Sequence, residues 1–456
     1  MASHQSSITF YGGTESVTGS NFLFETGGLK ILIDCGLFQG CRICGDLNVE
    51  SFPYGPSSID ALFVTHGHLD HVGRIPKLVR EGFRGVIYST PPTRDLGELM
   101  LFDSMGIMEK EAKREHTELL YQKEDVEKTM KLWRAVPYHE PISLMEGVTV
   151  RLKDSGHILG SSMVELERGG KKIVFTGDLG NSPAPLFHDT ETISDADYVV
   201  MESVYGDRNH PPREEQKGLL KQTIEETITN GGALMIPAFS IERTQVLLFE
   251  LNELVENKKI PPVPIFLDSP LAIKATAIYD KYENYFNREA TDIIKSGDDI
   301  FNFPGLKSTL RTEESKAIND VPNPKVIIAG SGMSAGGRII HHERRYLQDP
   351  KSTLLLIGYQ APGTLGRELR DGAKEVTILG ERVPVRANIL EISGYSGHKD
   401  SDALLEFISH DKNRAKKIFV VMGELKSAAF LAQKIRDTLS LEAVVPKKGE
   451  KRELLF

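Results

Sequence analysis

The sequence predicts an α/β protein in which a layered sandwich of strands and helices carries an inserted unit with a parallel sheet. Short apolar runs of strand length alternate with helical blocks over the first 208 residues. From about Asn209 the order becomes strand, turn and amphipathic helix, three times over, and isolated strand patterns return after Arg386. Repeated strand–turn–helix segments are typical of a doubly wound parallel sheet. With 456 residues, the chain is long enough for two domains.

The first part reads as strands that end in glycine-rich turns. Its strand candidates are ITFYGG at 8–13, NFLFET at 21–26, LKILIDCG at 29–36 and IDALFVTHG at 59–67. A helix is expected at Val72 to Glu81, and residues 95–133 are polar with a helical period. Residues 148–203 return to strands, so this part alternates sheet and helix blocks like a layered α/β sandwich.

The second part repeats a strand followed by a helix. The pairs are GGALMIPAF with ERTQVLLFELNELVEN, PIFLDS with PLAIKATAIYDKYENYF, and PKVIIAGSGMS with GGRIIHHERRYLQD. No low-complexity linker separates this part from its flanks. We therefore expect residues 209–386 to form a domain inserted between residues 1–208 and 387–456 of another.

Composition limits where the protein works and what it binds. The formal net charge is −9, so the surface as a whole is not the basic coat of a nonspecific nucleic-acid binder. No run of 18 apolar residues occurs, and the first residues lack the order of a signal peptide. We expect a cytoplasmic protein without a membrane segment, in which any contact with nucleic acid must come from a local patch or a bound metal.

The sharpest motif is His66-Gly-His68-Leu-Asp70-His71, at the end of the expected strand 59–65. Three imidazoles and a carboxylate within six residues are the ligand mix that suits zinc. Alternation directs His66 and His68 to one side, while the turn carries Asp70 and His71 toward a neighbouring position. The motif predicts two metal ions a few ångströms apart.

Further ligands are expected at two glycine-flanked strand ends, His157 in DSGHILGSS and Asp178 in VFTGDLG. Taken alone, each is more typical of a turn, because Asp and Gly dominate turns. Together with Asp34 and the HGHLDH segment, they match in order the first four motifs of the metallo-β-lactamase superfamily.

The agreement extends over essentially the whole chain. The segments MESVYGDR, GGALMIPAFSIERTQ, FLDSPLAIKAT, AGSGMSAGGRIIHH, IGYQAPGTLGREL and SGYSGHKDSD resemble the β-CASP branch of that superfamily. This branch includes the cleavage and polyadenylation nuclease, ribonuclease J and compact prokaryotic ribonucleases, and the compact forms are the most similar. The resemblance implies a metallo-β-lactamase αββα sandwich at 1–208 and 387–456, with a β-CASP doubly wound α/β domain at 209–386.

The resemblance also implies a role for each matching residue. A first zinc is held by His66, His68 and His157, a second by Asp70 and His71, and Asp178 bridges the two. Asp34 orients ligands, as carboxylates do for metal-bound imidazoles. Glu202 and His398 form the pair that transfers a proton to the leaving group. The catalytic residues implied by the resemblance are therefore Asp34, Asp70, Glu202 and His398.

The third β-CASP motif departs from the family pattern. A histidine followed by Gly-Glu is expected there, and this chain has Met422. A thioether is a poor zinc ligand beside carboxylates. Three outcomes are open: water fills the position, another histidine such as His342 replaces it, or the second site binds zinc weakly. Water is favoured, because catalytic zinc tolerates open positions.

The expected reaction is hydrolysis of single-stranded RNA. A hydroxide shared by the metals attacks the phosphodiester while His398, polarised by Glu202, protonates the leaving 3′ oxygen, which yields 5′-phosphate ends. Candidate substrate residues are Ser331, Gly332 and Arg338 near a helix start, Arg367 in GTLGREL, and Ser396 beside His398. Alternatives are a hydrolase of another phosphodiester or ester and a weakened RNA-binding subunit. A homodimer is possible.

Overall fold

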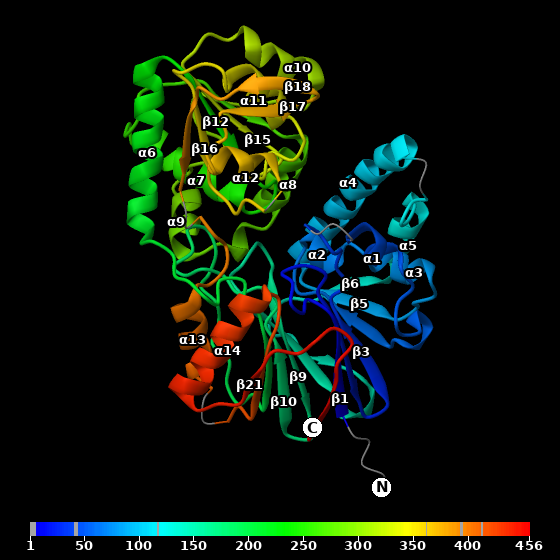
Figure 1. Ribbon diagram of the computed structural model, residues 1–456. Coiled ribbons are helices and arrows are strands. Elements are labelled where there is room, and N and C mark those ends of the chain that lie inside the picture. The colour runs from blue at the N-terminus through cyan, green and yellow to red at the C-terminus, as the bar shows by residue number, and fades with distance from the viewer. Residues whose placement is uncertain (1–5, 41–43, 116–117, 362, 393–394, 412–413) are drawn as a thin grey trace. The chain divides into compact units, whose positions relative to one another are not determined.

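The strand and helix pattern of the sequence is realised in a computed structural model (Figure 1), which describes residues 6–40, 44–115, 118–361, 363–392, 395–411 and 414–456. The described chain divides into two compact units. The first consists of Met1–Asn209 with His398–Phe456, and the second of His210–Gly397.

The first unit contains two mixed sheets. One has the strand order β22 (Lys451–Leu454), β1 (Ser6–Gly12), β2 (Asn21–Thr26), β3 (Leu29–Ile33), β4 (Ala61–Phe63), β5 (Val86–Ser89) and β6 (Trp133–Ala135). The other has the order β21 (Ala443–Val444), β20 (Lys417–Val420), β11 (Tyr198–Met201), β10 (Lys171–Phe175), β9 (Ser162–Arg168), β8 (Thr149–Asp154) and β7 (Ile142–Ser143). Each sheet therefore joins strands from both ends of the first unit.

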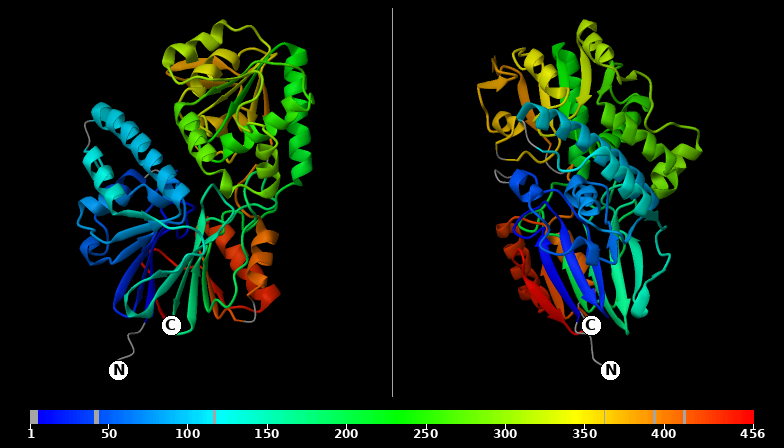
Figure 2. Two further views of the ribbon diagram at one scale, coloured as in Figure 1. Left: turned by 180° about the vertical axis from the view of Figure 1, so that it is seen from behind. Right: turned by 90° about the vertical axis from the view of Figure 1, so that its right-hand side faces the viewer.

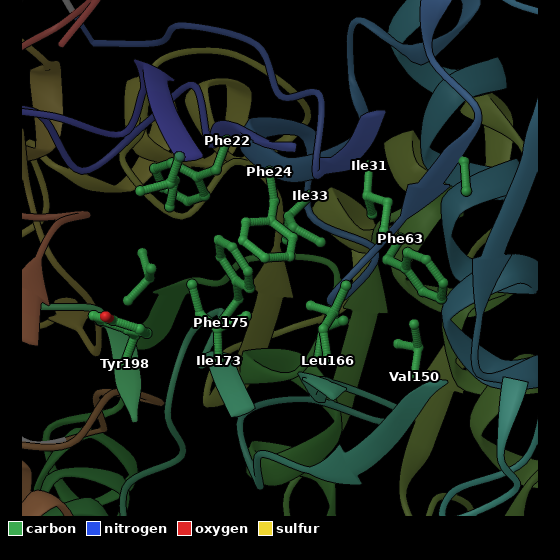
Figure 3. Packing of buried hydrophobic residues seen from close by; sticks show 14 of the residues in the cluster. Phe22, Phe24, Ile31, Ile33, Phe63, Val150, Leu166, Ile173, Phe175 and Tyr198 are labelled. Carbon is green, nitrogen blue, oxygen red and sulfur yellow. The ribbon is translucent and has the colours of Figure 1, made fainter. Parts of the chain in front are cut away.

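The inner faces of these sheets share one core. Side chains of a strand alternate between its two faces, so Ile31 and Ile33 of β3 enter this core while Leu32 packs on the outer face. Figure 3 shows Phe22 and Phe24 of the first sheet against Phe175 of the second, with ring centroids 6.3 Å apart in both pairs. The shared apolar interior holds the two sheets face to face.

Helices cover the two outer faces. Apolar residues of α2 to α5 pack on the outer face of the first sheet, and those of α13 and α14 on that of the second. The helices of this unit are α1 (Cys44–Val49), α2 (Leu69–Val72), α3 (Ile75–Arg80), α4 (Pro91–Glu115), α5 (Lys123–Leu132), α13 (Ser401–Ser409) and α14 (Leu425–Leu439). The layers confirm the αββα sandwich.

The second unit is built on a parallel sheet. Its order is β14 (Leu306–Ser308), β13 (Ile265–Asp268), β15 (Lys325–Ala329), β12 (Ala233–Pro237), β16 (Thr353–Leu356) and β19 (Asn388–Glu391). Each of these strands is parallel to its neighbours in the sheet. A separate hairpin consists of β17 (Glu375–Ile378) and β18 (Glu381–Pro384). This is the doubly wound arrangement expected from the repeated strand–turn–helix pattern.

Helices flank the parallel sheet (Figure 2). They are α6 (Arg213–Asn230), α7 (Arg243–Glu256), α8 (Pro270–Lys281), α9 (Arg288–Lys295), α10 (Thr312–Ala317), α11 (Ile339–Tyr346) and α12 (Leu365–Arg370). Over the described part of the chain, no helix combines the length and the apolar character needed to cross a membrane.

The return from the second unit to the first lies later than the expected boundary at residue 386. Strand β19 pairs with β16 from Thr353↔Asn388 to Leu356↔Glu391, so residues just after 386 extend the parallel sheet of the second unit. The first unit resumes at His398. The ANILEIS segment has the same apolar character in either sheet, and only the long-range pairing decides which sheet it joins.

Candidate metal centre

The ends of strands in both sheets of the first unit carry the expected ligands. His66 follows β4, Asp178 follows β10, and His157 lies in the turn between β8 and β9. His68 is the N-cap of the short helix α2, and His71 is buried within it. Because strand ends and a helix start meet here, residues far apart in the sequence reach one position.

The closest group consists of His66, His68, His157 and Asp178, each of which offers one ligand atom within 4.8 Å of the others. Asp178 Oδ2 lies 3.5 Å from His66 Nε2 and 3.6 Å from His157 Nε2. The Nε2 of His66 and the Nδ1 of His68 are 3.0 Å apart. These four residues are therefore placed to hold one ion.

A second position lies on the other side of Asp178. Its Oδ1 is 3.5 Å from His71 Nε2, which in turn is 3.8 Å from Asp70 Oδ2. Asp178 thus presents one oxygen to each group, as a bridging ligand does.

Two buried atoms test whether the site fits a metal. His71 Nε2 and Asp178 Oδ1 have no hydrogen-bond partner among the described residues, although their side chains are 0% and 5% exposed. Buried polar atoms are normally paired. Imidazole nitrogens and carboxylate oxygens are zinc ligands, so a divalent ion would satisfy both atoms, and the residues fit the implied metal.

Charges within the cluster favour the ligand forms of two residues. Burial and the neighbouring His71 lower the pKa of His66 well below its ordinary value, so its ring is neutral and offers a lone pair. Burial alone would raise the pKa of Asp178, but His71 and His66 hold it well below its usual range. Asp178 is therefore a carboxylate at neutral pH.

Asp34 lies completely buried beneath His71. Its Oδ2 accepts a hydrogen bond from His71 Nδ1 at 2.7 Å and others from Ser20 Oγ at 3.0 Å and Thr65 Oγ1 at 2.9 Å. Its φ of 56° lies in the left-handed region, where non-glycine residues are uncommon. These bonds fix the His71 ring with Nε2 toward Asp178. The supporting Ser20 and Thr65 were not anticipated, since neither carries a signal in the sequence.

Glu202 and His398 meet beside this cluster. Glu202 is fully buried at the end of β11, and its Oε1 lies 3.2 Å from His398 Nδ1 and accepts from the Leu179 backbone N–H at 2.6 Å. His398 is 21% exposed, and its Nδ1 is 4.0 Å from Asp178 Oδ2. The pair joins a buried carboxylate to an imidazole at the rim of the site.

Met422 follows β20, the strand that neighbours β11 and its Glu202. It is 2% exposed and belongs to the core between the sheets. Its backbone N–H donates to Gly13 O at 2.6 Å, and its sulfur packs so close to Gly13 that a Cβ there would overlap it. The thioether therefore serves as core packing.

His342, the histidine considered as a replacement ligand, has another partner. It lies on α11 of the second unit, where its Nε2 is 2.7 Å from Asp268 Oδ2. The structure offers no support for this alternative.

Arg338 is directed to the same buried carboxylate. Its guanidinium donates to Asp268 Oδ1 at 2.7 Å and to the backbone oxygens of Thr309 and Leu310 at 2.8 and 2.9 Å. Asp268 is fully buried at the end of β13 and requires a counter-charge. Arg338 therefore stabilises a turn of the second unit, and its expected contact with phosphate stays a prediction. Asp268, the centre of this network, was missed.

The other candidate substrate residues lie in loops or at a helix of the second unit. Ser331 Oγ accepts from Ala335 N at 3.0 Å, and Gly332 O accepts from the amide of Gln360 at 3.0 Å. Arg367 on α12 donates to Asp371 at 2.7 Å and is 33% exposed. Ser396 is half-buried on the segment that leads to His398. The expected contacts of these four residues with substrate stay predictions.

Comparison with known families gives three matches along the chain. Residues 23–196 match a metallo-beta-lactamase superfamily domain, residues 244–369 a Beta-Casp domain, and residues 382–446 a Zn-dependent metallo-hydrolase RNA specificity domain.

Known proteins are similar over nearly the whole chain. Ribonuclease TTHA0252 of Thermus thermophilus is 38% identical over 91% of this chain and 93% of its own length. An RNase J-like protein of Methanocaldococcus jannaschii is 33% identical over 97% and 98%. The transcription termination factor FttA of Methanosarcina mazei is 33% identical over 95% of this chain and 69% of its own. A solved Enterococcus faecalis protein of unknown function shares the fold, with a TM-score of 0.57, 14% identity and coverage of 99% and 100%.

Proposed function

Because this chain belongs to the β-CASP branch of the metallo-β-lactamase superfamily, we propose that it is a two-zinc ribonuclease that hydrolyses phosphodiester bonds of single-stranded RNA. Two of its relatives are named ribonuclease or RNase J-like, and a domain model for RNA specificity matches its C-terminal part. The observation that carries the proposal is the meeting of a ligand cluster with the Glu202–His398 pair around one carboxylate, Asp178.

Each ligand group would hold one zinc. His66, His68 and His157 supply three nitrogens on one side of Asp178, and Asp70 and His71 lie on the other. When bound, two zinc ions would lower the pKa of water to near neutrality and stabilise the charge that develops on the phosphate oxygens. Asp34 keeps the His71 ring aligned through Nδ1.

Glu202 and His398 would handle the proton of the leaving group. Glu202 forms a hydrogen bond with Nδ1 of His398, so Nε2 is the ring nitrogen that would donate a proton to the substrate. An imidazolium beside a buried carboxylate can give its proton to the leaving 3′ oxygen. The products would be 5′-phosphate and 3′-hydroxyl ends.

End-labelled single-stranded RNA tests the proposal. We expect zinc-loaded protein to cleave it with 5′-phosphate products, and His398→Ala to lower kcat by about 10²- to 10⁴-fold, the range of general acid catalysis. His139→Ala, at a 61% exposed side chain paired with Glu191, is the matched control and should retain activity. Cleavage at the wild-type rate by His398→Ala, or no cleavage by wild type, contradicts the proposal.

A catalytically weakened RNA-binding subunit is the second candidate, and Met422 is the observation that favours it. Such a subunit would bind single-stranded RNA without cleaving it, even when loaded with zinc. The remaining expected ligands are present and gathered, which favours the enzyme.

A further inference from the structure

We propose that Phe239 and Tyr359 form a stacking surface for an unpaired RNA base at the carboxyl edge of the parallel sheet in the second unit. The inference rests on the proposed function, since it names a part of the same substrate that the second unit would bind.

The sheet topology singles out this edge. Strands β12 and β15 are neighbours, but the chain continues from β12 to β13 in one direction across the sheet and from β15 to β16 in the opposite direction. Ligands of open α/β sheets bind beyond the carboxyl ends of strands where the connections diverge in this way. Phe239 follows β12, and Gly332 follows β15.

The Phe239 ring lies on two glycines from neighbouring loops. A Cβ added at Gly332 would lie 2.7 Å from the ring, closer than real Cβ contacts, and one at Gly358 would lie 3.3 Å away. Neither glycine has a positive φ, so the backbone conformation does not require glycine there. Close packing of the aromatic ring accounts for both.

The base of this surface is built from buried polar contacts. The Gln360 side chain is fully buried, and its amide nitrogen donates to the oxygens of Gly332 and Gly358, both at 3.0 Å. The Phe239 carbonyl accepts from the backbone N–H and the hydroxyl of Thr244 at 3.2 and 2.8 Å. These bonds fix the backbone that carries and supports the ring, and Phe239 itself is 36% exposed.

Tyr359 adds a second aromatic ring and a nearby cation. It directly follows Gly358 and is 38% exposed. Arg367 follows eight residues later on α12 and supplies a cation whose side chain is 33% exposed. Exposed aromatic rings beside a cation are the means by which proteins hold single-stranded nucleic acid, because every base has a π face and every link a phosphate.

Binding of short single-stranded RNA to zinc-loaded protein tests the inference. Fluorescence anisotropy would measure Kd for phosphorothioate RNA, which is cleaved slowly. The RNA would carry either all of its bases or one abasic position, which is moved along the strand. We expect Phe239→Ala to raise Kd by about 5- to 100-fold, the range for one stacked base. Tyr359→Ala should also raise Kd. Phe239→Trp keeps an aromatic ring and should bind RNA with a Kd close to that of wild type.

The abasic series separates stacking from a merely structural role. In wild type, at least one abasic position should weaken binding, and this sensitivity should disappear in Phe239→Ala. The slope of log Kd against log salt should not change in Phe239→Ala, because stacking releases no counterions, whereas Arg367→Ala should lower it by about 0.7. Phe430→Ala, at a 51% exposed phenylalanine of α14, is the matched control.

Unchanged Kd in Phe239→Ala and Tyr359→Ala, or abasic sensitivity that persists in both, overturns the stacking surface. If wild type binds RNA with the expected sensitivity to abasic positions but cleaves no RNA, the proposed function is overturned and the stacking surface is not. Wild type that binds none of these RNAs overturns both.

Discussion

Met422 shows how a ligand position can become part of the core. Its backbone lies at the end of β20, beside the strand that carries Glu202, but its thioether packs against Gly13 and the apolar interior. Among the described residues, Asp70, His71 and Asp178 are the expected ligands near the second position. We therefore expect the second zinc to be held more weakly than the first.

Met422→His should therefore raise zinc occupancy toward two ions per chain, measured by elemental analysis after dialysis at a fixed free zinc concentration. A more complete ligand set binds the ion more tightly. Met422→Leu conserves the volume of the core side chain and should leave occupancy unchanged. If wild type already holds two ions with equal affinity, water or another side chain completes the second site.

Glu343 is a buried carboxyl for which the described part of the chain provides no cationic partner. It is fully buried on α11, Ser334 Oγ donates to its Oε1, and its Oε2 has no hydrogen-bond partner among the described residues. Burial raises its pKa from 4.5 to about 7. The folded state therefore retains a proton that the unfolded chain releases at lower pH.

Because the folded-state pKa is raised, the stability from protonated Glu343 is present below about pH 4.5 and is lost as the pH rises through 7. Glu343→Gln removes this dependence. We expect wild type to lose up to about 3 kcal/mol relative to Glu343→Gln between pH 5 and 8, measured by denaturant unfolding. The exposed Glu368→Gln retains Glu343 and should follow the wild-type pH profile, whereas parallel pH profiles for wild type and Glu343→Gln would refute the prediction.

At the scale of elements, both ends of the second unit meet one carboxylate of α7. Glu250 is 2% exposed; the Tyr395 hydroxyl, on the returning segment, donates to its Oε2, and Arg213, at the start of α6, lies 3.7 Å from its Oε1. Residues 182 positions apart thus share one buried partner. This contact ties both connecting segments to the helix layer of the second unit.

Tyr395→Phe removes the hydroxyl and leaves Glu250 with one partner fewer in a buried place. We expect the second unit to lose about 1 to 3 kcal/mol of unfolding free energy, the cost of an unsatisfied buried acceptor. Hydrogen exchange at α7 would measure the loss. Glu250→Gln keeps an acceptor for the hydroxyl and should destabilise less, and equal protection in Tyr395→Phe and wild type would contradict this role.

At the scale of the whole molecule, the ligands and the parallel sheet belong to separate cores. All the expected metal ligands lie in the first unit, whereas the second unit has its own apolar cluster. Metal binding should therefore stabilise the two units unequally.

Removal of zinc by a chelator should lower the unfolding free energy of the first unit by about 4 kcal/mol at a reference zinc concentration 1,000 times Kd. Hydrogen exchange should increase at β10 and β11 and remain unchanged at β12 and β15, and added zinc should reverse the effect. Equal loss of protection in both units would show that the metal stabilises the chain through some other route.

Much of this architecture is already predictable from local sequence. Strand-length apolar runs and strand–turn–helix repeats indicate the sandwich and the parallel sheet. The spacing of apolar side chains along a strand or a helix is a property of neighbouring residues and can be read from the sequence. The HGHLDH segment likewise places four potential ligands on one turn. The fold class and the kind of metal centre follow from such local patterns and from the family resemblance they carry.

Only the tertiary structure decides which partners these residues meet. Residues 388–391 join the sheet of the second unit through pairing with β16, Arg338 turns to the buried Asp268, and the Met422 side chain enters the core. The Phe239 ring is held between glycines 93 and 119 residues away. The physical reason is the same in each case: burial, counter-charge and close packing are set by segments far apart in the chain, and a local pattern contains no information about them.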